Sequence, residues 1–562
     1  MSTKGSKGNR VLVIGLDGAT FRVLDPLIEA GVLPNLERLM IEGARGTLWS
    51  TIPPISAAAW TTFITGKNPG KHGIFHFVSL GLAATPEVSD DVVEVGVGAY
   101  AVVNANSIRD ATLWQMVSEA GKRLVVINVP MTYPPRPING VMITSMLTPP
   151  GAEQYTYPPE LKDQLEDYQI ELDLLRRRTT LSKAQIIHAL AESVSMRGRV
   201  ALRLMRQEPW DVFTIVFTET DRLQHRFWNY LCPTAEGYDG PEAREHRPAL
   251  HRFFSDLDDW VGRLVEEAGP EVSVVIMSDH GFTARGRKRV YVRALAHELG
   301  LFSLGKASWV SRLRAISESV LGLRYTQVYS VLKRVLPREF VTRVFRSLRG
   351  RDRRGFDSQK GRVIKFQQAV GAVSLNRRPL DARAQSELER IRGRLETLRD
   401  PVDGCKVVRK VAAVDEIYWG PLTKTLPPLM FFLEDGYGLT SGTGRRGRVI
   451  EHQQTAPDLL GMHAPDGILV LRGPAIVRRE LAGEFFIWDV TATVLYLLGM
   501  PIPRDLDGRV VSEALDPDFL AVHPIRRSEG MHEGGTGGGP RGYSREEAEA
   551  VEARLRGLGY ID

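Results

Sequence analysis

The sequence predicts an α/β fold around a doubly wound, mostly parallel sheet with helices on both faces. Two observations lead to this prediction: short apolar runs recur along the chain, and segments with apolar residues at helical spacing separate them. Continuous apolar runs are typical of parallel strands that are buried on both faces. The clearest of these predicted parallel strands are Val11–Leu16, Leu124–Asn128, Val212–Phe217, Val272–Met277 and Ile468–Leu471.

Helices are expected where apolar residues recur every three or four positions. This spacing occurs in Pro26–Glu42, Leu181–Arg206 and Pro248–Glu267. Strands that alternate with helices favour the doubly wound arrangement. The length of 562 residues fits one large α/β domain with insertions, or a core with a cap.

Two stretches depart from the strand and helix alternation. Leu301–Arg354 is basic and amphipathic, which predicts an inserted helical cap, and the runs VIKF, GAVSLN and LMFFLE after it predict a small accessory sheet. Near the end, Ser544 and Glu547 have the spacing of a helix capping box, after a Gly-rich stretch. The predicted organisation is a catalytic core in residues 10–300, the cap in 301–360, the rest of the core in 361–524, and a linker with a C-terminal helix in 525–562.

Composition and charge narrow the function classes. The chain is 43% apolar and 25% charged, as globular proteins are, and its net charge of +6 is too small to indicate nucleic-acid binding. Two cysteines, Cys232 and Cys405, provide neither a disulfide framework nor a thiolate zinc site. We find neither a signal peptide nor about 18 uninterrupted apolar residues, so a cytoplasmic protein without a membrane span is expected. The basic cap either packs on the core as a lid, which we favour, or contacts an anionic membrane surface through residues 301–354.

Acidic residues and histidines fall at the ends of the predicted strands. Because ligands bind at the carboxyl ends of strands in an open α/β sheet, we expect these side chains to converge. Singly, an Asp after a strand is more often a turn residue and a lone His a packing residue. The six candidates are Asp17 after the first strand, Asp221 and His225 after the third, Asp279 and His280 after the fourth, and His463 just before the fifth.

Three carboxylates and three imidazoles without a thiolate suit a divalent ion such as Zn²⁺ or Mn²⁺. Six ligands are too many for one tetrahedral site. They fit two ions about 4 Å apart, an arrangement that is used for phosphoryl chemistry. The sequence therefore predicts two divalent metal ions as cofactors.

Ser56 is the candidate nucleophile. It follows Pro53-Pro54 and precedes a good helix start, Ala-Ala-Ala-Trp-Thr-Thr-Phe. One interpretation is an ordinary helix N-cap. The other is a serine whose alkoxide, and the phosphoryl oxyanion it attacks, are stabilised by the helix dipole, by free N–H groups and by a metal ion.

Several motifs occur in the order seen in the alkaline phosphatase superfamily. They are Gly15-Leu-Asp-Gly18, Thr65-Gly-Lys-Asn-Pro-Gly-Lys-His-Gly-Ile74 after Ser56, Asp221 with His225, Ser278-Asp-His-Gly-Phe282, and Gly461-Met-His463. Segments at Trp488–Gly499 and Arg504–Arg509 look like the C-terminal helix and turn of that superfamily. Within it the chain most resembles the type I phosphodiesterase/nucleotide pyrophosphatase family, over about Val11–Val511.

The resemblance implies a division of labour among these residues. Asp221, His225 and His463 would hold the first ion, and Asp17, Asp279 and His280 the second, with Ser56 facing the second. The expected reaction is hydrolysis of a phosphodiester or phosphoanhydride of nucleotide-like small molecules through a phosphoseryl intermediate. The alternatives are a phosphomonoesterase, phosphonate hydrolase, transferase or sulfatase of the same superfamily, and last a non-catalytic binding protein.

Departures from the family pattern concern the substrate. Many nucleotide pyrophosphatases use Thr where this chain has Ser56, and an Asn that contacts a phosphoryl oxygen is missing from the stretch Phe75-His76-Phe77. His76 is the candidate replacement for that Asn. Lys67 and Lys71 either face the anionic substrate or are solvated charges in a Pro-Gly turn. His72 is expected to be a packing residue rather than a ligand.

Overall fold

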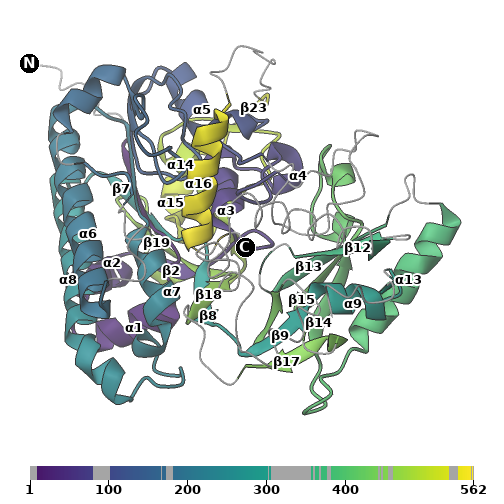
Figure 1. Cartoon of the computed structure of the whole chain (residues 1–562). Helices are drawn as coiled ribbons and strands as arrows, with labels where there is room; N and C mark the ends of the chain where they lie inside the picture. Colours follow the sequence, from purple (N-terminus) through teal and green to yellow (C-terminus); the bar gives the residue numbers. More distant parts are fainter. Residues whose placement is uncertain are drawn as a thin grey trace, which may run out of the picture.

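The chain folds into a larger α/β body and a smaller lobe, as Figure 1 shows for a computed structural model. The larger body is built on a ten-stranded sheet, and the smaller lobe contains a separate four-stranded sheet. The structure describes residues 9–79, 101–165, 168–171, 181–301, 303–304, 356–357, 361–365, 367, 369–375, 381–440, 444, 447–453, 460–530, 542–558 and 560.

The centre of the large sheet consists of the parallel strands β7 (Ser273–Met277), β1 (Val11–Leu16) and β6 (Val212–Phe217). Val11 lies opposite Val212 on one side and Ser273 on the other, so the three strands end at the same level. Beyond β6 the order continues with β3 (Leu124–Ile127), β4 (Gly140–Ile143) and the antiparallel β5 (Thr156–Tyr157). Beyond β7 come β19 (Asp466–Arg472), β2 (Ala44–Trp49), β20 (Arg479–Glu480) and β21 (Phe485–Phe486).

One predicted parallel strand runs the other way. Ile468–Leu471 lies within β19, which is antiparallel to both β7 and β2. The chain enters β19 from β18 (Gly461–Ala464), at the carboxyl end of β7, so β19 must run back along the sheet. The apolar run reflected burial on both faces, and burial does not distinguish the two strand directions.

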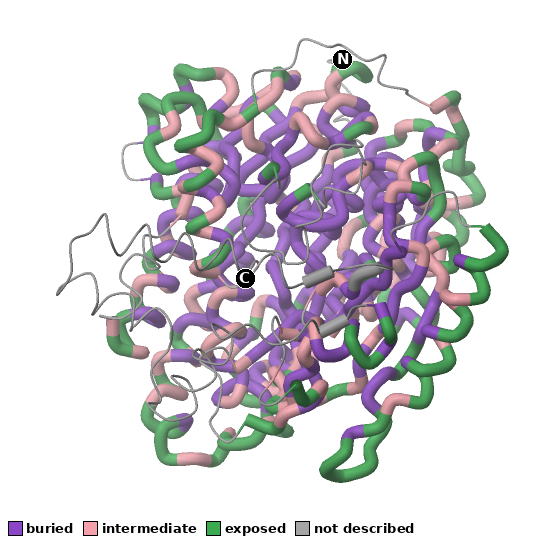
Figure 2. The backbone as a smooth tube through the Cα atoms, turned by 45° about the vertical axis from the view of Figure 1, so that its right-hand side comes forward, coloured by how far each residue is buried: buried purple, intermediate pink, exposed green. Residues whose placement is uncertain are grey.

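Helices cover both faces of the sheet, and successive residues of β1 point to opposite faces. Val11 and Val13 pack with α3 (Ser56–Thr65), α5 (Leu113–Glu119) and α14 (Ile487–Leu497). Leu12 and Ile14 pack with α1 (Phe21–Glu29), α2 (Pro34–Glu42), α6 (Lys183–Gln207), α7 (Glu219–Leu231) and α8 (Pro241–Ala268). Figure 2 shows the buried interior that results. The alternation follows from the two-residue period of a strand.

The helix predicted over Pro26–Glu42 is two helices. Alpha-helix α1 ends at Glu29 and α2 begins at Pro34, and Gly31 between them has a φ of +70°. A left-handed residue ends a helix, which the apolar spacing alone did not reveal. Helices α6 and α8 cover the other two predicted segments.

The smaller lobe contains the predicted accessory sheet, in the order β12 (Gly361–Lys365), β13 (Val370–Leu375), β15 (Leu429–Leu433) and β14 (Val408–Ala413). Helices α9 (Val292–Glu298) and α13 (Ala382–Glu396) pack with it in one apolar cluster. The predicted cap at 301–360 lies outside the described residues, apart from 301, 303–304 and 356–357. The remaining elements are α4 (Pro69–His72), β8 (Gly281–Ala284), β9 (Lys288–Tyr291), β10 (Ser303–Leu304), β11 (Phe356–Asp357), β16 (Tyr437–Thr440), β17 (Ile450–His452), β22 (Ile502–Pro503), α15 (Pro517–Val522), β23 (Arg527–Ser528) and α16 (Arg545–Leu558).

Within the described ranges, no helix is long and apolar enough to cross a membrane. Cys232 is buried and Cys405 is exposed, and neither forms a disulfide.

Candidate active site

The six predicted ligands meet at one edge of the large sheet. Asp17 directly follows β1, Asp221 lies in the first turn of α7 after β6, and Asp279 and His280 follow β7. Because β7, β1 and β6 are adjacent and parallel, their carboxyl ends bring these side chains together. His463 comes from β18, where it lies opposite Phe282 of β8 in an antiparallel pair.

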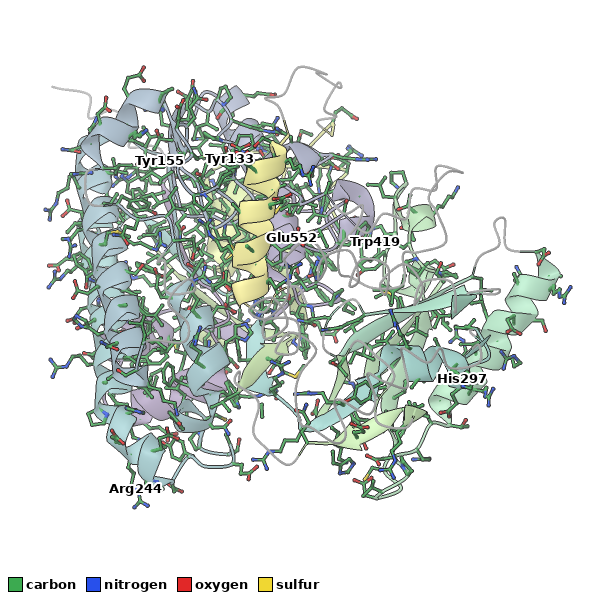
Figure 3. The ribbon with its side chains drawn as sticks, viewed as in Figure 1. Tyr133, Tyr155, Arg244, His297, Trp419 and Glu552 are labelled. Atoms are coloured by element: carbon green, nitrogen blue, oxygen red, sulfur yellow. The ribbon has the colours of Figure 1, made fainter. Side chains whose placement is uncertain are left out.

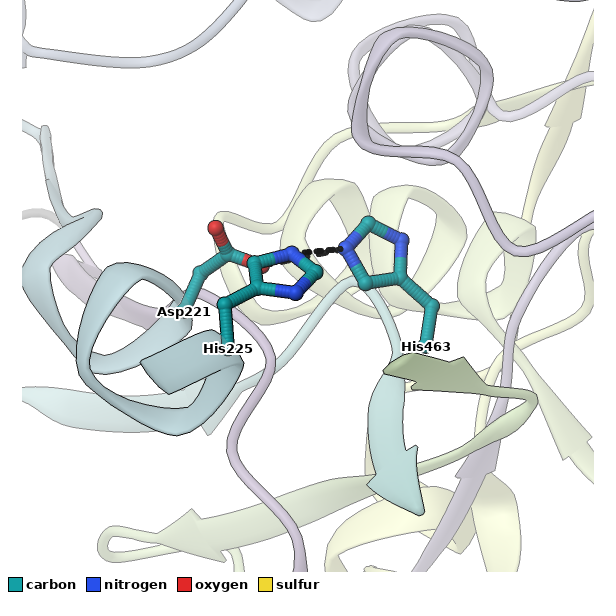
Figure 4. Close-up of side chains that lie close together, drawn as sticks. All are labelled: Asp221, His225 and His463. Atoms are coloured by element: carbon teal, nitrogen blue, oxygen red, sulfur yellow. Dashed lines mark hydrogen bonds and ion pairs between the residues drawn. The ribbon is translucent and has the colours of Figure 1, made fainter. Parts of the chain in front are cut away.

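The first group is formed by Asp221, His225 and His463 (Figure 4). Oδ1 of Asp221 lies 3.1 Å from Nε2 of His463 and 3.4 Å from Nε2 of His225. The two Nε2 atoms are 3.0 Å apart. One carboxylate oxygen and two imidazole nitrogens thus face a common centre, as zinc ligands do.

The second group surrounds Nε2 of His280. This nitrogen lies 3.4 Å from Oδ2 of Asp279 and 3.7 Å from Oδ1 of Asp17. It also lies 4.0 Å from Oδ1 of Asp221, so Asp221 adjoins both groups. The rings of His280 and His463 stack with centroids 3.6 Å apart. The two groups are therefore neighbours, as a two-ion site requires.

Backbone carbonyls orient all three histidines in the same way. Nδ1 of His225 bonds the carbonyl of Gly461 at 3.1 Å, and Nδ1 of His280 bonds that of Gly281 at 3.1 Å. Nδ1 of His463 bonds the carbonyl of Pro54 at 2.8 Å. A carbonyl only accepts, so each Nδ1 carries the proton and each Nε2 presents a lone pair to the site. This arrangement is typical of metal-binding histidines.

The carboxylates of the second group are buried close to one another, which disfavours their charged forms unless a cation is bound. Burial, and then the carboxylates of Asp279 and Asp221, raise the pKa of Asp17 well above its ordinary value. Burial and then Asp221 raise the pKa of Asp279 to about 7. Oδ1 of Asp17 and Oδ2 of Asp279 are buried and have no hydrogen-bond partner among the described residues. Buried, unpartnered carboxylate oxygens fit a divalent ion, because such oxygens are costly to leave unpaired.

Metal binding is expected to release more protons at pH 6 than at pH 8. In the metal-free folded protein the Asp279 carboxyl has a pKa of about 7, far above the ordinary value of 3.8, so it keeps its proton at pH 6. Its contribution to the free energy of unfolding therefore falls as the pH rises from about 4 to about 7. A cation displaces that proton, and the difference should be about one proton. Calorimetric titration with Zn²⁺ in buffers of different ionisation enthalpy measures it. Equal proton release at both pH values would contradict the expectation.

Ser56 is the first residue of α3 and is not its N-cap. The N-cap is Ile55, which makes no side-chain cap, so the N-cap interpretation is wrong. The Ser56 side chain is fully buried, and its Oγ lies 3.2 Å from Nε2 of His280. Since that nitrogen presents a lone pair, the hydroxyl donates to it. The hydroxyl thus joins the second group, at the N-terminal end of a helix.

Trp60 is a site residue that the sequence did not reveal. It lies one helical turn after Ser56, and its Nε1 donates to Oδ2 of Asp17 at 3.2 Å. Its ring packs so closely on β1 that a Cβ on Gly15 would lie 2.4 Å from the ring. Gly15 thus allows α3 to approach the strand that ends in Asp17. The spacing of Trp60 from Ser56 was the available signal, but it fits a packing residue equally well.

Lys67 and Lys71 are bound to carboxylates of the same chain. Lys67 is only 3% exposed, and its ammonium binds Asp110 at 2.6 Å and also Asp505. Lys71 forms an ion pair with Asp507. For Lys67, the interpretation as a solvated charge in a turn is therefore wrong, because its ammonium is bound to Asp110 and Asp505.

Lys67→Ala is expected to lower the free energy of unfolding by about 2 kcal/mol, because it leaves two partly buried carboxylates without the ammonium that pairs with them. Chemical denaturation measures this loss, with exposed Lys162→Ala as the control, expected to change stability by less than about 0.5 kcal/mol. The kcat and KM of the folded variant should stay near wild type. A raised KM with unchanged stability would instead place Lys67 at the substrate.

The two remaining histidines of this region differ in setting. His72 is fully buried, accepts from the N–H of Ile74 at 3.1 Å and lies 3.0 Å from Oγ1 of Thr62. Burial lowers the pKa of His72 to about 3, so it is a neutral packing residue, as expected. His76 is also buried, and its Nδ1 accepts from the N–H of Val78 at 3.4 Å.

A third cluster in the described chain, Asp400, Asp403 and His452, has metal-ligand composition. Lys288 already places its ammonium 2.6 Å from Asp403, and His452 binds Asp400 at 2.7 Å. The cluster is therefore charge-paired without an ion.

Solved structures of other proteins resemble this chain in fold. A crystal structure of phosphonoacetate hydrolase from Sinorhizobium meliloti 1021, in complex with phosphonoformate, has a TM-score of 0.53 at 15% identity, covering 87% of this chain and 95% of that one. Human ectonucleotide pyrophosphatase/phosphodiesterase 5 aligns at a TM-score of 0.47 and 12% identity, over 90% of this chain and 100% of that one. A search of curated proteins found no match.

The likeness to the phosphonoacetate hydrolase concerns the fold alone, whereas the family follows from the sequence. The sequence model of the type I phosphodiesterase / nucleotide pyrophosphatase family matches residues 11–466. That span runs from the start of β1 to the start of β19 and contains Ser56 and all six predicted ligands. The chain therefore belongs to the type I phosphodiesterase/nucleotide pyrophosphatase family.

Proposed function

We propose that the chain hydrolyses phosphodiester or phosphoanhydride bonds of nucleotide-like small molecules, with Ser56 as nucleophile and two divalent ions, zinc or manganese, as cofactors. Family membership supports the coarser part of this, a hydrolase of the phosphodiesterase/pyrophosphatase type. The observation that carries the finer part is the approach of Ser56 to His280, within a cluster of three carboxylates and three imidazoles.

The proposed division of the ligands is the one that the family resemblance implies, with Asp221 adjoining both groups. Asp221, His225 and His463 would hold one ion, and Asp17, Asp279 and His280 the other. When bound, the ions supply Lewis-acid stabilisation of the serine alkoxide, of water and of the phosphoryl oxygens.

Ser56 is placed to act as nucleophile because its Oγ is fixed at the second group. In the first step the Ser56 hydroxyl gives up its proton to water and Oγ forms a bond to phosphorus, while the bond to the leaving group breaks and the leaving group takes up a proton from water. In the second step water attacks the phosphoseryl group, which releases the phosphoryl product and restores the hydroxyl. Trp60, through its bond to Oδ2 of Asp17, keeps one carboxylate of the second group in place beside Ser56.

His76 is the proposed contact to a phosphoryl oxygen. The N–H of Val78 donates to its Nδ1, so the ring hydrogen is on Nε2, and an Nε2–H is a donor to an oxyanion. The next residue, Phe77, packs 4.7 Å from the ring of Tyr560, whose hydroxyl bonds Asp221. The segment that carries His76 is therefore linked to the first group through Tyr560. We also keep the prediction of a cytoplasmic location as part of this proposal.

A substrate panel tests the proposal. The metal-loaded protein would be assayed in parallel on p-nitrophenyl phosphate, bis-p-nitrophenyl phosphate, a nitrophenyl ester of a nucleoside monophosphate, p-nitrophenyl sulfate and phosphonoacetate. We expect the two diesters to have the highest kcat/KM. The phosphonoacetate arm is included because a phosphonoacetate hydrolase shares the fold. A preference for the monoester, the sulfate or the phosphonate would replace the proposed substrate class.

A further inference from the structure

Tyr560 reaches the first group from the far end of the chain. Its hydroxyl donates to Oδ2 of Asp221 at 2.7 Å, across 339 residues of sequence. Its ring lies beside both imidazoles of that group, with centroids 6.2 Å from His225 and 5.9 Å from His463. The ring also packs on Phe77, with centroids 4.7 Å apart. Tyr560 therefore contacts both the first group and the segment that contains His76.

Helix α16 holds this tyrosine in position by docking on the larger body. Figure 3 shows the helix, on which Glu552 is labelled, lying across that body with Tyr133 beside its upper end. Val551 and Leu555, one turn apart, are fully buried in the cluster that includes α3 and α14. The N–H of Tyr560 donates to the carbonyl of Leu555 at 3.0 Å, which fixes the turn after the helix.

Hydrogen bonds fix the orientation in which α16 docks. The guanidinium of Arg554 donates to the carbonyls of Met146 at 2.8 Å and of Thr148 at 2.6 Å. The hydroxyl of Tyr543 donates to the carbonyl of Leu147 at 2.8 Å, and its ring stacks on Tyr133. These bonds link Arg554 of the helix and Tyr543, just before it, to the same stretch, Met146–Thr148, and so fix the position of α16 and of Tyr560 after it.

The two oxygens of Asp221 have separate partners. Oδ1 faces Nε2 of His225 and of His463, whereas Oδ2 accepts from Tyr560. The tyrosine thus occupies the carboxylate oxygen that the imidazoles leave aside, so it does not compete for the centre that they share. We propose that Tyr560 is a positioning residue that orients the Asp221 carboxylate for a divalent cation and closes one side of the first group.

This proposal rests on the proposed function, because it needs an ion at the first group. A hydrogen bond to the second oxygen restricts rotation of the carboxylate, so less conformational entropy is lost when a cation binds. The ring also excludes water from a site in which Asp221 is 1% exposed, which strengthens its attraction to a cation. A tail that merely blocked the site would instead face Oδ1 and the shared centre.

Tyr560→Phe is the test, because it removes the hydroxyl and keeps the ring on Phe77. Tyr543→Phe is the matched control: it removes a tail hydroxyl that bonds Leu147 and not the metal group. The affinity of each full-length protein for Zn²⁺ is measured by competition with a chromophoric chelator, and the visible absorption of Co²⁺ reports the geometry at the site. Removal of an outer-shell partner weakens metal binding by about 10- to 100-fold. We therefore expect Tyr560→Phe to bind Zn²⁺ about tenfold more weakly than wild type, and Tyr543→Phe to bind it with wild-type affinity.

The kinetics separate positioning from direct substrate contact. At limiting metal, Tyr560→Phe should be less active, and excess metal should restore kcat with KM near wild type. A raised KM that excess metal does not correct, an increase in activity, or wild-type Zn²⁺ affinity with an unchanged Co²⁺ spectrum would each overturn the proposal. In those cases a wild-type protein that binds two ions and cleaves diesters leaves the proposed function standing, whereas a wild-type protein that binds no ion overturns both.

Discussion

Ser56→Ala is expected to lower kcat/KM for the preferred diester by at least about 10²-fold, the scale on which loss of a nucleophile reduces rates. The reason is local: Oγ is the hydroxyl that bonds His280 within the second group, 3.2 Å from its Nε2. Removing it leaves the three carboxylates and three imidazoles in place, so the variant should still bind two ions. Steady-state kinetics and metal content, measured on the same preparation, check both parts.

Two further variants make this test specific. Ser56→Thr keeps a hydroxyl and should retain much of the rate, since related nucleotide pyrophosphatases use Thr. Thr62→Val removes another buried hydroxyl of α3, one that bonds His72, and should keep the wild-type rate. A Ser56→Ala protein as active as wild type would exclude the covalent mechanism, and trapping of labelled phosphate on wild type but not on Ser56→Ala would support it.

The strands that carry the ligands could be predicted closely because their sequence pattern is local. β1 and β6 have the predicted bounds, and β7 differs by one residue, since short, continuous apolar runs are typical of strands buried on both faces. What the pattern lacks is direction and interruption. The antiparallel course of β19 depends on where β18 delivers the chain, and the break between α1 and α2 depends on a left-handed Gly31.

The site shows the same division between local and distant information. Asp17, Asp221 and Asp279 could be placed together because each follows a strand of one parallel sheet. The partners that orient them could not, because their contacts arise only when distant elements pack. Tyr560 meets Asp221 across 339 residues, and Lys67 meets Asp505 across 438 residues. In the sequence alone, Tyr560 looks like part of a tail and Lys67 like part of a turn.

Two single substitutions, one in each group, are each expected to remove one ion and to reduce kcat/KM by about 10³-fold. His225→Ala takes away one of the two imidazoles that face Asp221, and Asp17→Asn takes away a charged oxygen beside His280. Metal ions contribute several kcal/mol of transition-state stabilisation, which corresponds to a rate factor of this size. Metal content by elemental analysis should fall from two ions per chain to one in each variant, and chelation of the wild type should abolish activity reversibly.

The cluster of Asp400, Asp403 and His452 provides the control that gives these counts their meaning. It has the same ligand types, but the ammonium of Lys288 is already ion-paired with both carboxylates, so His452→Ala should leave two ions and the wild-type rate. If composition alone decided where ions bind, His452→Ala would lose one. The expected contrast between His225→Ala and His452→Ala instead follows from geometry: only the edge of the large sheet combines inward Nε2 lone pairs with buried carboxylate oxygens that lack a partner in the described chain. One ion per wild-type chain, or two in His225→Ala, would contradict this assignment.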